Sequence, residues 1–259
     1  MQSIHPPVIE NATARGRIVL ICEHASNHMP APWGHLGLTQ TQCGTHIAWD
    51  LGALGLARGL ARRLDAVLIH APVSRLIYDC NRAPDMGGAM PARSEIHDVP
   101  GNAALSPADR LARTEAVYLP FHDAAHGVIT RRIALGLAPV VVTIHSFTPV
   151  YFGRPRSVEF GVIHDADASL AHAIHAAACS LTRLDTQLNA PYSAADDVTH
   201  TLRALATPYG LLNAMLEVRH DLIAGPLAEE AMAETLAPVL TAAVLNMGLI
   251  EIQRQAKAG

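Results

Sequence analysis

Histidine and carboxylate side chains stand at the ends of three apolar segments with the character of β-strands. His24 follows residues 18–22, His145 follows residues 138–144, and Glu217 lies near the end of a third such run. Parallel strands end at one edge of an α/β sheet, and ligands bind in the crevice beyond that edge. Two imidazoles and a carboxylate that meet there can hold a zinc-like ion with one position open. A single histidine in a strand-to-loop turn can equally cap the local backbone. A metal site is favoured because three strands end in the same way.

A fourth candidate, Asp50, lies where a long helical pattern begins. Residues 45–64 are expected to form this helix, with a core-facing stripe of Leu54, Ala57, Ala61 and Leu64. Extending the stripe back by one turn reaches Asp50. A buried carboxylate there needs a cation or several donors, whereas an exposed one would be stabilised by the helix dipole. Both interpretations stay open from the sequence.

Polar residues next to His24 and His145 fit catalytic roles less well than the two histidines do. His28 follows His24 by four residues, but a proline comes too soon for a helix, so His28 is expected to be exposed or behind the ligands. Asn27 can contact a metal or its water, although an amide is a poor zinc ligand. Ser146 adjoins His145 and therefore points to the opposite face of the strand. The sequence contains no H-E-x-x-H, G-x-S-x-G or G-x-x-x-x-G-K-[ST] motif.

A second polar segment, residues 73–82, follows a strand predicted at 66–70. If this segment were a strand, alternation would place Arg75, Ile77, Asp79 and Asn81 on one face. Three of these four residues are polar, and Arg82 follows them. That face is either a solvated edge or a polar wall for a carboxylate-bearing ligand, because arginine offers two parallel donors to a carboxylate. Residues 83–105 then form an unusually long connection, which indicates a lid, a binding loop or a disordered segment.

The elements that must position these residues alternate between strand and helix. This order predicts an α/β fold with a largely parallel sheet covered on both faces, built as a single domain over residues 1–259. Further helices are expected at 106–137 (broken near Pro120), 166–181 and 226–247, further strands at 158–164 and 211–218, and a turn-rich loop at 189–197.

Composition excludes several other classes of protein. The 259 residues are 50% apolar and only 16% charged, with a net charge of -4 and no Lys/Arg cluster, so neither nucleic acid nor an anionic membrane is an expected partner. The N-terminus lacks a charged segment followed by an apolar core. The four cysteines show no C-x-x-C spacing, which favours reduced thiols in a cytoplasmic protein. Oligomeric state is not predicted.

Several segments together resemble one known family. In chain order they are EHASNHMP, the DLGA that begins at Asp50, SRLIYDCNR, GNAALS followed by YLPFH, TIHSFTP, NAPYS and LEVRHDL. Spread from about residue 19 to 223, they resemble the N-formylglutamate amidohydrolase family, which is similar in fold to zinc carboxypeptidases and aspartoacylase-type deacylases. The resemblance implies a three-layer αβα sandwich with a mixed, largely parallel sheet, as in zinc exopeptidases and phosphorylase/hydrolase-like folds.

The same resemblance implies roles for individual residues. His24 and His145 would bind one divalent metal, with zinc expected, and Glu217 would activate the water. The H-x-x-E spacing of carboxypeptidases places Asn27 at the middle ligand, so Asp50 is chosen instead. Substrate-binding roles are implied for Asn81, Arg82, Arg156 and Tyr192.

The implied activity is hydrolysis of a small acidic N-acyl amino acid, N-formyl-L-glutamate, to formate and glutamate. Family members that act in histidine breakdown commonly contain P-H-S-G and C-H-S-M-P, whereas this chain has E-H-A-S-N and I-H-S-F-T-P. The alternatives are therefore a related metal-dependent deacylase or peptidase with another substrate, and a non-catalytic protein that binds small ligands.

Overall fold

The centre of the fold is a seven-stranded sheet whose middle strands are apolar on both faces. In the computed structural model, which describes residues 4–258, every residue of β2 is buried. Ile18, Leu20 and Cys22 contribute to the hydrophobic core on one side of the sheet, whereas Val19 and Ile21 contribute to the core on the other side. Period-two alternation within an entirely apolar strand thus produces two cores, as expected for a sheet covered on both faces.

The sheet is mixed but largely parallel. Its strand order is β1-β3-β2-β6-β11-β9-β10, and β1–β3 and β11–β9 are its antiparallel pairs. The strands are β1 (Val8–Glu10), β2 (Ile18–Cys22), β3 (Val67–His70), β6 (Val140–Phe147), β9 (Phe160–Ile163), β10 (Thr186–Leu188) and β11 (Asn213–Arg219). Two small hairpins, β4–β5 (Arg93–Ser94 and His97–Asp98) and β7–β8 (Val150–Tyr151 and Arg154–Pro155), lie outside it.

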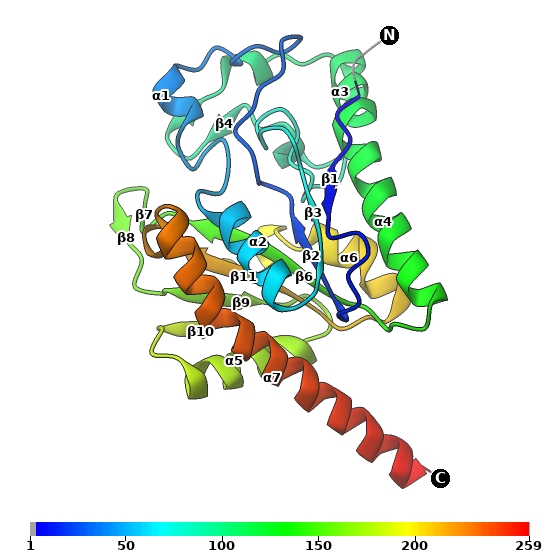
Figure 1. The fold of residues 1–259 in the computed structure, drawn as a ribbon. Coiled ribbons are helices and arrows are strands. Elements are labelled where there is room, and N and C mark those ends of the chain that lie inside the picture. Colours follow the sequence, from blue (N-terminus) through cyan, green and yellow to red (C-terminus); the bar gives the residue numbers. More distant parts are fainter. Residues whose placement is uncertain (1–3, 259) are drawn as a thin grey trace.

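Helices cover both faces of the sheet (Figure 1). One core includes residues of α2, α5 and α7, and the other includes residues of α4 and α6. The helices are α1 (Gln40–Cys43), α2 (Ala53–Arg63), α3 (Pro107–Arg113), α4 (Leu119–Ala134), α5 (Ser169–Leu181), α6 (His200–Leu205) and α7 (Pro226–Ala258). The predicted αβα sandwich is confirmed.

Parallel pairing brings the carboxyl ends of three strands to one edge. β2 pairs with β6, placing Ile21 opposite Thr143, and β11 pairs with β6, placing Glu217 opposite His145. Residues that follow β2 or lie late in β6 and β11 therefore meet at the same place.

The helix predicted at 45–64 begins later than expected, at Ala53. Residues 45–52 form turns instead, so the prediction that Asp50 lies on the helix is wrong. Gly52 precedes the helix with φ of +75°, and a Cβ there would lie 2.4 Å from the carbonyl oxygen of Ile223. This left-handed residue reverses the chain and prevents the helix from extending backwards.

The strand predicted at 73–82 is also wrong, because this segment is a buried series of turns. Ser74 donates through its hydroxyl to the carbonyl of Ala48 at 2.7 Å, and the Asp79 carboxylate accepts the Asn81 backbone N–H at 2.9 Å. Short polar side chains bond to nearby backbone here, which stabilises turns over a strand ladder.

The kink or break predicted near Pro120 takes the form of a π-helical turn within a continuous helical segment. Helix α3 begins with a capping box at Ser106 and leads into a π-helical turn, Thr114–Tyr118, before α4 starts with Pro120 in its first turn. A proline fits the first turn of a helix because its missing N–H would have no partner there.

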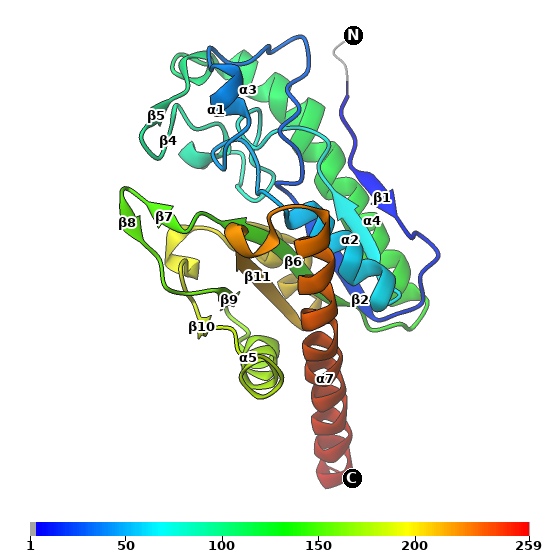
Figure 2. The same ribbon diagram turned by 60° about the vertical axis from the view of Figure 1, so that its left-hand side comes forward.

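Helix α7 continues past the predicted end at 247 and projects beyond the sheet (Figure 2). Its part Pro226–Gly248 is long and apolar enough to cross a membrane by length and composition, and 44% of its most apolar 18-residue window is buried within the fold. Because α7 packs against α2 and α5, it behaves as a core helix of the sandwich.

Replacing Gly52 with alanine should destabilise the protein by roughly 3 kcal/mol, because a left-handed alanine is strained and its Cβ would meet a backbone oxygen. The matched control is Gly34→Ala, where φ is +52° and no atom lies within 4 Å of the added Cβ. Urea unfolding of both variants measures the difference. Equal stabilities for the two variants would show that the Ile223 contact does not require glycine.

Candidate metal centre

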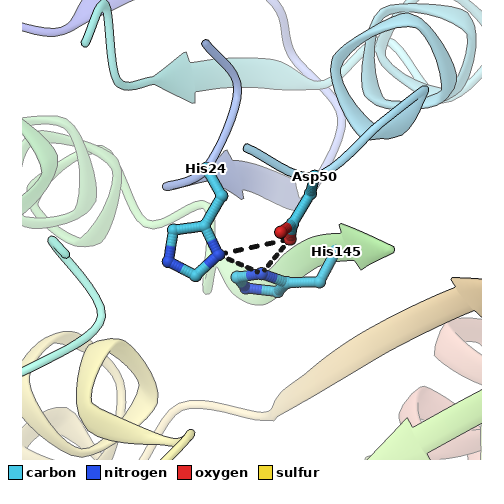
Figure 3. Close-up of side chains that lie close together, drawn as sticks. All are labelled: His24, Asp50 and His145. Carbon is cyan, nitrogen blue, oxygen red and sulfur yellow. Dashed lines mark hydrogen bonds and ion pairs between the residues drawn. The ribbon is translucent and has the colours of Figure 1, made fainter. Parts of the chain in front are cut away.

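Three donor atoms from separate parts of the chain converge at the carboxyl edge of the sheet (Figure 3). His24 Nδ1 lies 3.2 Å from His145 Nδ1 and 3.2 Å from Asp50 Oδ2, and His145 Nδ1 lies 2.9 Å from the same oxygen. His24 follows β2, His145 is in β6, and Asp50 is in the turns before α2. All three residues are buried, with relative exposures of 3%, 1% and 3%.

This triangle has the size of one face of a zinc coordination shell. Bonds of about 2.0–2.1 Å in tetrahedral geometry place the ligand atoms about 3.3 Å apart, close to the distances of 2.9–3.2 Å between the three donor atoms. Two imidazole nitrogens that face each other at such a distance need a proton or a cation between them. The donor set therefore fits a divalent ion, and the sequence-predicted ligands lie together.

Buried charge also favours a cation. Four carboxyl groups, those of Glu23, Asp50, Asp79 and Glu217, are each at most 3% exposed and surround the two histidines and one guanidinium, that of Arg75. When the imidazoles are neutral, as ligands to a metal must be, and the four acids are ionised, the four negative charges outnumber that guanidinium charge by three. A divalent ion offsets most of the imbalance, and buried charges are otherwise costly.

Each histidine has an acid beside its other ring nitrogen. Asp79 Oδ1 lies 2.7 Å from His24 Nε2. Glu23 Oε2 lies 3.2 Å from His145 Nε2, an ion-pair distance without hydrogen-bond alignment. Carboxylates in these positions hold the Nε2–H tautomer, leaving the Nδ1 lone pair to bind a metal. Neither acid is singled out as a site residue by the sequence pattern, although Asp79 lies on the predicted polar face of 73–82 and Glu23 directly follows an apolar strand.

Arg75 joins the two aspartates. Its Nη1 lies 3.2 Å from Asp50 Oδ1 and its Nη2 lies 2.9 Å from Asp79 Oδ2. One guanidinium thus orients a predicted metal ligand and the acid behind His24. Sequence analysis noted Arg75 on a polar face but did not select it as a site residue.

These contacts shift the pKa values of the cluster. Burial by itself raises the pKa of Asp50, but the charge of His24 and hydrogen bonds from both histidines hold it well below its ordinary value. For His145, burial favours the neutral ring, yet Glu23 and Asp50 raise its pKa well above the ordinary value. Without a metal, the cluster therefore retains protons on its imidazoles, and an ion must displace them.

Glu217 differs from the other three acids because nearby positive charge and hydrogen bonds do not offset the cost of burying its carboxylate. Its Oε2 is buried without a hydrogen-bond partner among the described residues. Burial, supported by the nearby charge of Asp50 and opposed by His145, raises the pKa of Glu217 from 4.5 to about 7. A carboxyl group with a pKa near neutrality can both accept and return a proton.

A cavity of about 170 Å³ opens onto the cluster. Its walls include the predicted residues His24, Asp50, Asn81, Arg82, His145, Tyr192 and Glu217, together with Arg75. A larger cavity of about 780 Å³, between α4 and the segment after β1, has no histidine, cysteine or acidic residue in its lining. The chemistry therefore belongs to the small cavity.

Of the four predicted substrate-binding residues, Asn81, Arg82 and Tyr192 line the cavity and Arg156 does not. Arg82 lines the cavity and donates to the carbonyl of Asp197. Asn81 also lines it, but its amide donates to the carbonyl of Val198 and accepts the backbone N–H of Thr201, so both of its polar groups hold the opposite wall.

Arg156 lies behind the cavity wall. Its guanidinium stacks on the rings of Tyr151 and Tyr192, at 4.3 and 4.8 Å from their centroids, and donates to the Tyr192 hydroxyl at 3.0 Å. The residues left uncertain by the sequence, Asn27 and His28, are exposed and do not line the cavity.

The mixed sheet, the buried His–Asp–His cluster and the adjacent carboxyl group define an α/β enzyme whose active cavity is suited to a divalent ion. The family model of N-formylglutamate amidohydrolases matches residues 16–224. The chain belongs to this family, whose members hydrolyse an amide bond.

Solved structures of other proteins are similar to the chain. A gene product from Agrobacterium tumefaciens is 48% identical, with a TM-score of 0.92 and coverage of 94% of this chain and 96% of that one. The N-formylglutamate amidohydrolase of Ralstonia eutropha JMP134 shares the fold at 18% identity, with a TM-score of 0.66 and coverage of 95% and 100%. No curated protein sequence matches the chain.

Replacing Asp79 with asparagine should weaken zinc binding by roughly 10–100-fold, because the change removes the charge that holds the His24 ring. The control is Asp98→Asn, whose side chain is 77% exposed in a surface pair. Competition with a coloured chelator at fixed pH gives both affinities. Wild-type affinity in the Asp79 variant would show that His24 is not oriented through this contact.

Proposed function

We propose that the protein is a cytoplasmic, metal-dependent amidohydrolase for small acidic N-acyl amino acids, with N-formyl-L-glutamate as its first expected substrate. The observation that carries the proposal is the convergence of three donor atoms beside Glu217 in a chain of this family. We assign the activity to residues 1–259 as one hydrolase domain, because a single sheet draws strands from Val8 to Arg219 and α7 packs against the helices on one face.

Metal ligation is proposed for His24, Asp50 and His145. When bound there, a divalent ion would polarise the acyl carbonyl and lower the pKa of water toward about 7. Asp79 and Glu23 hold the two imidazoles, and Arg75 holds Asp50 while keeping a positive charge at the cavity wall. That charge stabilises the negative charge that develops on the acyl oxygen.

Glu217 is the proposed proton carrier. Its carboxylate takes a proton from the attacking water as the water oxygen bonds to the acyl carbon. The same proton passes to the amide nitrogen as the carbon–nitrogen bond breaks, which releases formate and the amino acid. Burial raises the pKa of Glu217 above its ordinary value, which suits both halves of this transfer.

The remaining walls would bind the amino-acid part. We assign Arg82, which lines the cavity, to the substrate carboxylate, because arginine offers two parallel donors. Asn81 supports it by holding the 198–201 backbone. Tyr192 accepts from Arg156, so its own hydroxyl hydrogen is directed elsewhere, and we assign it to the substrate. A cavity of about 170 Å³ restricts this substrate to a small molecule.

Chelation should abolish hydrolysis of N-formyl-L-glutamate, and added zinc should restore it. The assay compares the N-formyl and N-acetyl derivatives of glutamate, with N-formyl-L-leucine, whose side chain is uncharged, as the control. Turnover that survives complete metal removal would contradict the metal dependence. Preference for another acyl amino acid would support an amidohydrolase with a different substrate. Calorimetric binding without turnover would favour a binding protein.

Replacing Glu217 with glutamine should lower kcat by roughly 10²–10⁴-fold while zinc affinity is retained, because Glu217 is not one of the three donors. Wild-type kcat/KM should rise with pH as Glu217 ionises, since only the ionised form accepts a proton. A bound cation lowers this pKa, so the rise falls between pH 4.5 and 7.

The matched control is Glu234→Gln, at an exposed position of α7, which should keep wild-type kcat and pH profile. Near-normal turnover in the Glu217 variant would contradict a role of Glu217 in the mechanism. So would a variant whose kcat/KM still rises with pH as in the wild type.

A further inference from the structure

The long connection 83–105 is folded and forms the outer wall of the cavity. It contains the β4–β5 hairpin, and Ser94 and Glu95 from this hairpin line the cavity. The β7–β8 hairpin lies on the same side of the molecule (Figure 2) and contributes Tyr151 to the lining. Two hairpins from distant parts of the sequence therefore meet at the cavity.

One carboxylate joins these hairpins to a third segment. Glu95 Oε1 accepts the backbone N–H of Phe152 at 2.8 Å, and Glu95 Oε2 lies 2.9 Å from His46 Nε2. The side chain of Glu95 is only 11% exposed. Both of its oxygens are thus occupied, one by the β7–β8 hairpin and one by the turns that lead to Asp50.

The backbone of Glu95 adopts a conformation that suits its place in a tight hairpin turn. Its φ is +50°, a left-handed value that residues with a Cβ seldom adopt and that costs of the order of 1 kcal/mol. Glu95 is the first of the two residues that join β4 to β5, a position where tight hairpin turns favour a positive φ.

Apolar packing contributes little at the junction. Ile96 and Phe152, at the tips of the two hairpins, are 60% and 56% exposed. Gln42 contacts His97 at 3.2 Å, but this contact ties the β4–β5 hairpin to α1 and not to β7–β8. Among the described residues, the Glu95 carboxylate therefore provides the side-chain hydrogen bond that links the two hairpins.

We propose that Glu95 is a positioning residue that closes the outer wall of the catalytic cavity. Its bond to Phe152 holds the β7–β8 hairpin, whose Tyr151 stacks on Arg156, which in turn donates to Tyr192. The effect of Glu95 on substrate rests on the proposed function, whereas its effect on the wall does not. Loss of the link loosens the wall and leaves the His24–Asp50–His145 cluster in place.

Amide hydrogen exchange at Phe152 tests the wall directly, without substrate. In Glu95→Ala the amide should exchange roughly tenfold faster than in the wild type, and in Glu95→Gln the increase should be smaller, because the amide oxygen still accepts. Asp98→Ala, at an exposed position of the same hairpin, should match the wild type. Exchange at the wild-type rate in both Glu95 variants would overturn the proposal.

Two further measurements extend the test to the cavity. A chelator should remove zinc faster from Glu95→Ala than from the wild type, and KM for N-formyl-L-glutamate should rise several-fold with kcat nearly unchanged. A fall in kcat at constant KM would contradict a positioning role. If no N-acyl amino acid is hydrolysed but the exchange and zinc-release effects are present, the proposed function fails and the role of Glu95 stands.

Discussion

The structure depends on keeping acidic groups and imidazoles buried within one small volume. Removing a carboxylate from water is costly, and the cost is offset only where a cation or several donors meet it. Here Arg75 spans Asp50 and Asp79, each histidine lies beside an acid, and the three inner donor atoms converge on one point. A divalent ion at that point would offset most of the remaining negative charge.

Strand pairing makes this convergence possible. The register of β6 with β2 and β11 brings His145 level with Glu217 and next to the residue that follows β2. Asp50 arrives by a different route, through a chain reversal at Gly52, and its backbone N–H donates to the carbonyl of His24 at 2.9 Å. The rigid sheet thus fixes two predicted ligands and the predicted base, while a turn supplies the remaining ligand.

Much of this arrangement could be predicted because it follows from local patterns. The apolar runs before His24 and His145 predicted buried strands, and strands of one sheet that end together bring their last residues together. The segment 73–82 was not predictable in the same way, since its period-two alternation matched a strand while its Ser74 and Asp79 side chains bond to backbone and form turns. Pairing of Asp79 with His24 and of Glu23 with His145 depends on tertiary contacts, which spacing along the chain does not encode.

The similarity to the Ralstonia eutropha enzyme at 18% identity shows that this sheet tolerates extensive change in sequence. Such tolerance is expected where a fold depends on the volume and pattern of apolar residues. By contrast, the donor atoms of the cluster must stay within tenths of an ångström of their positions to coordinate an ion. The outer wall, built from two hairpins and held by Glu95, is the part best suited to vary with the substrate.

The proposed mechanism depends on one ion held between His24, Asp50 and His145, and anomalous scattering from crystals grown with zinc can detect it. We expect a single strong peak about 2.0–2.2 Å from His24 Nδ1, His145 Nδ1 and an oxygen of Asp50. Zinc bound elsewhere, or no peak between these side chains, would contradict it.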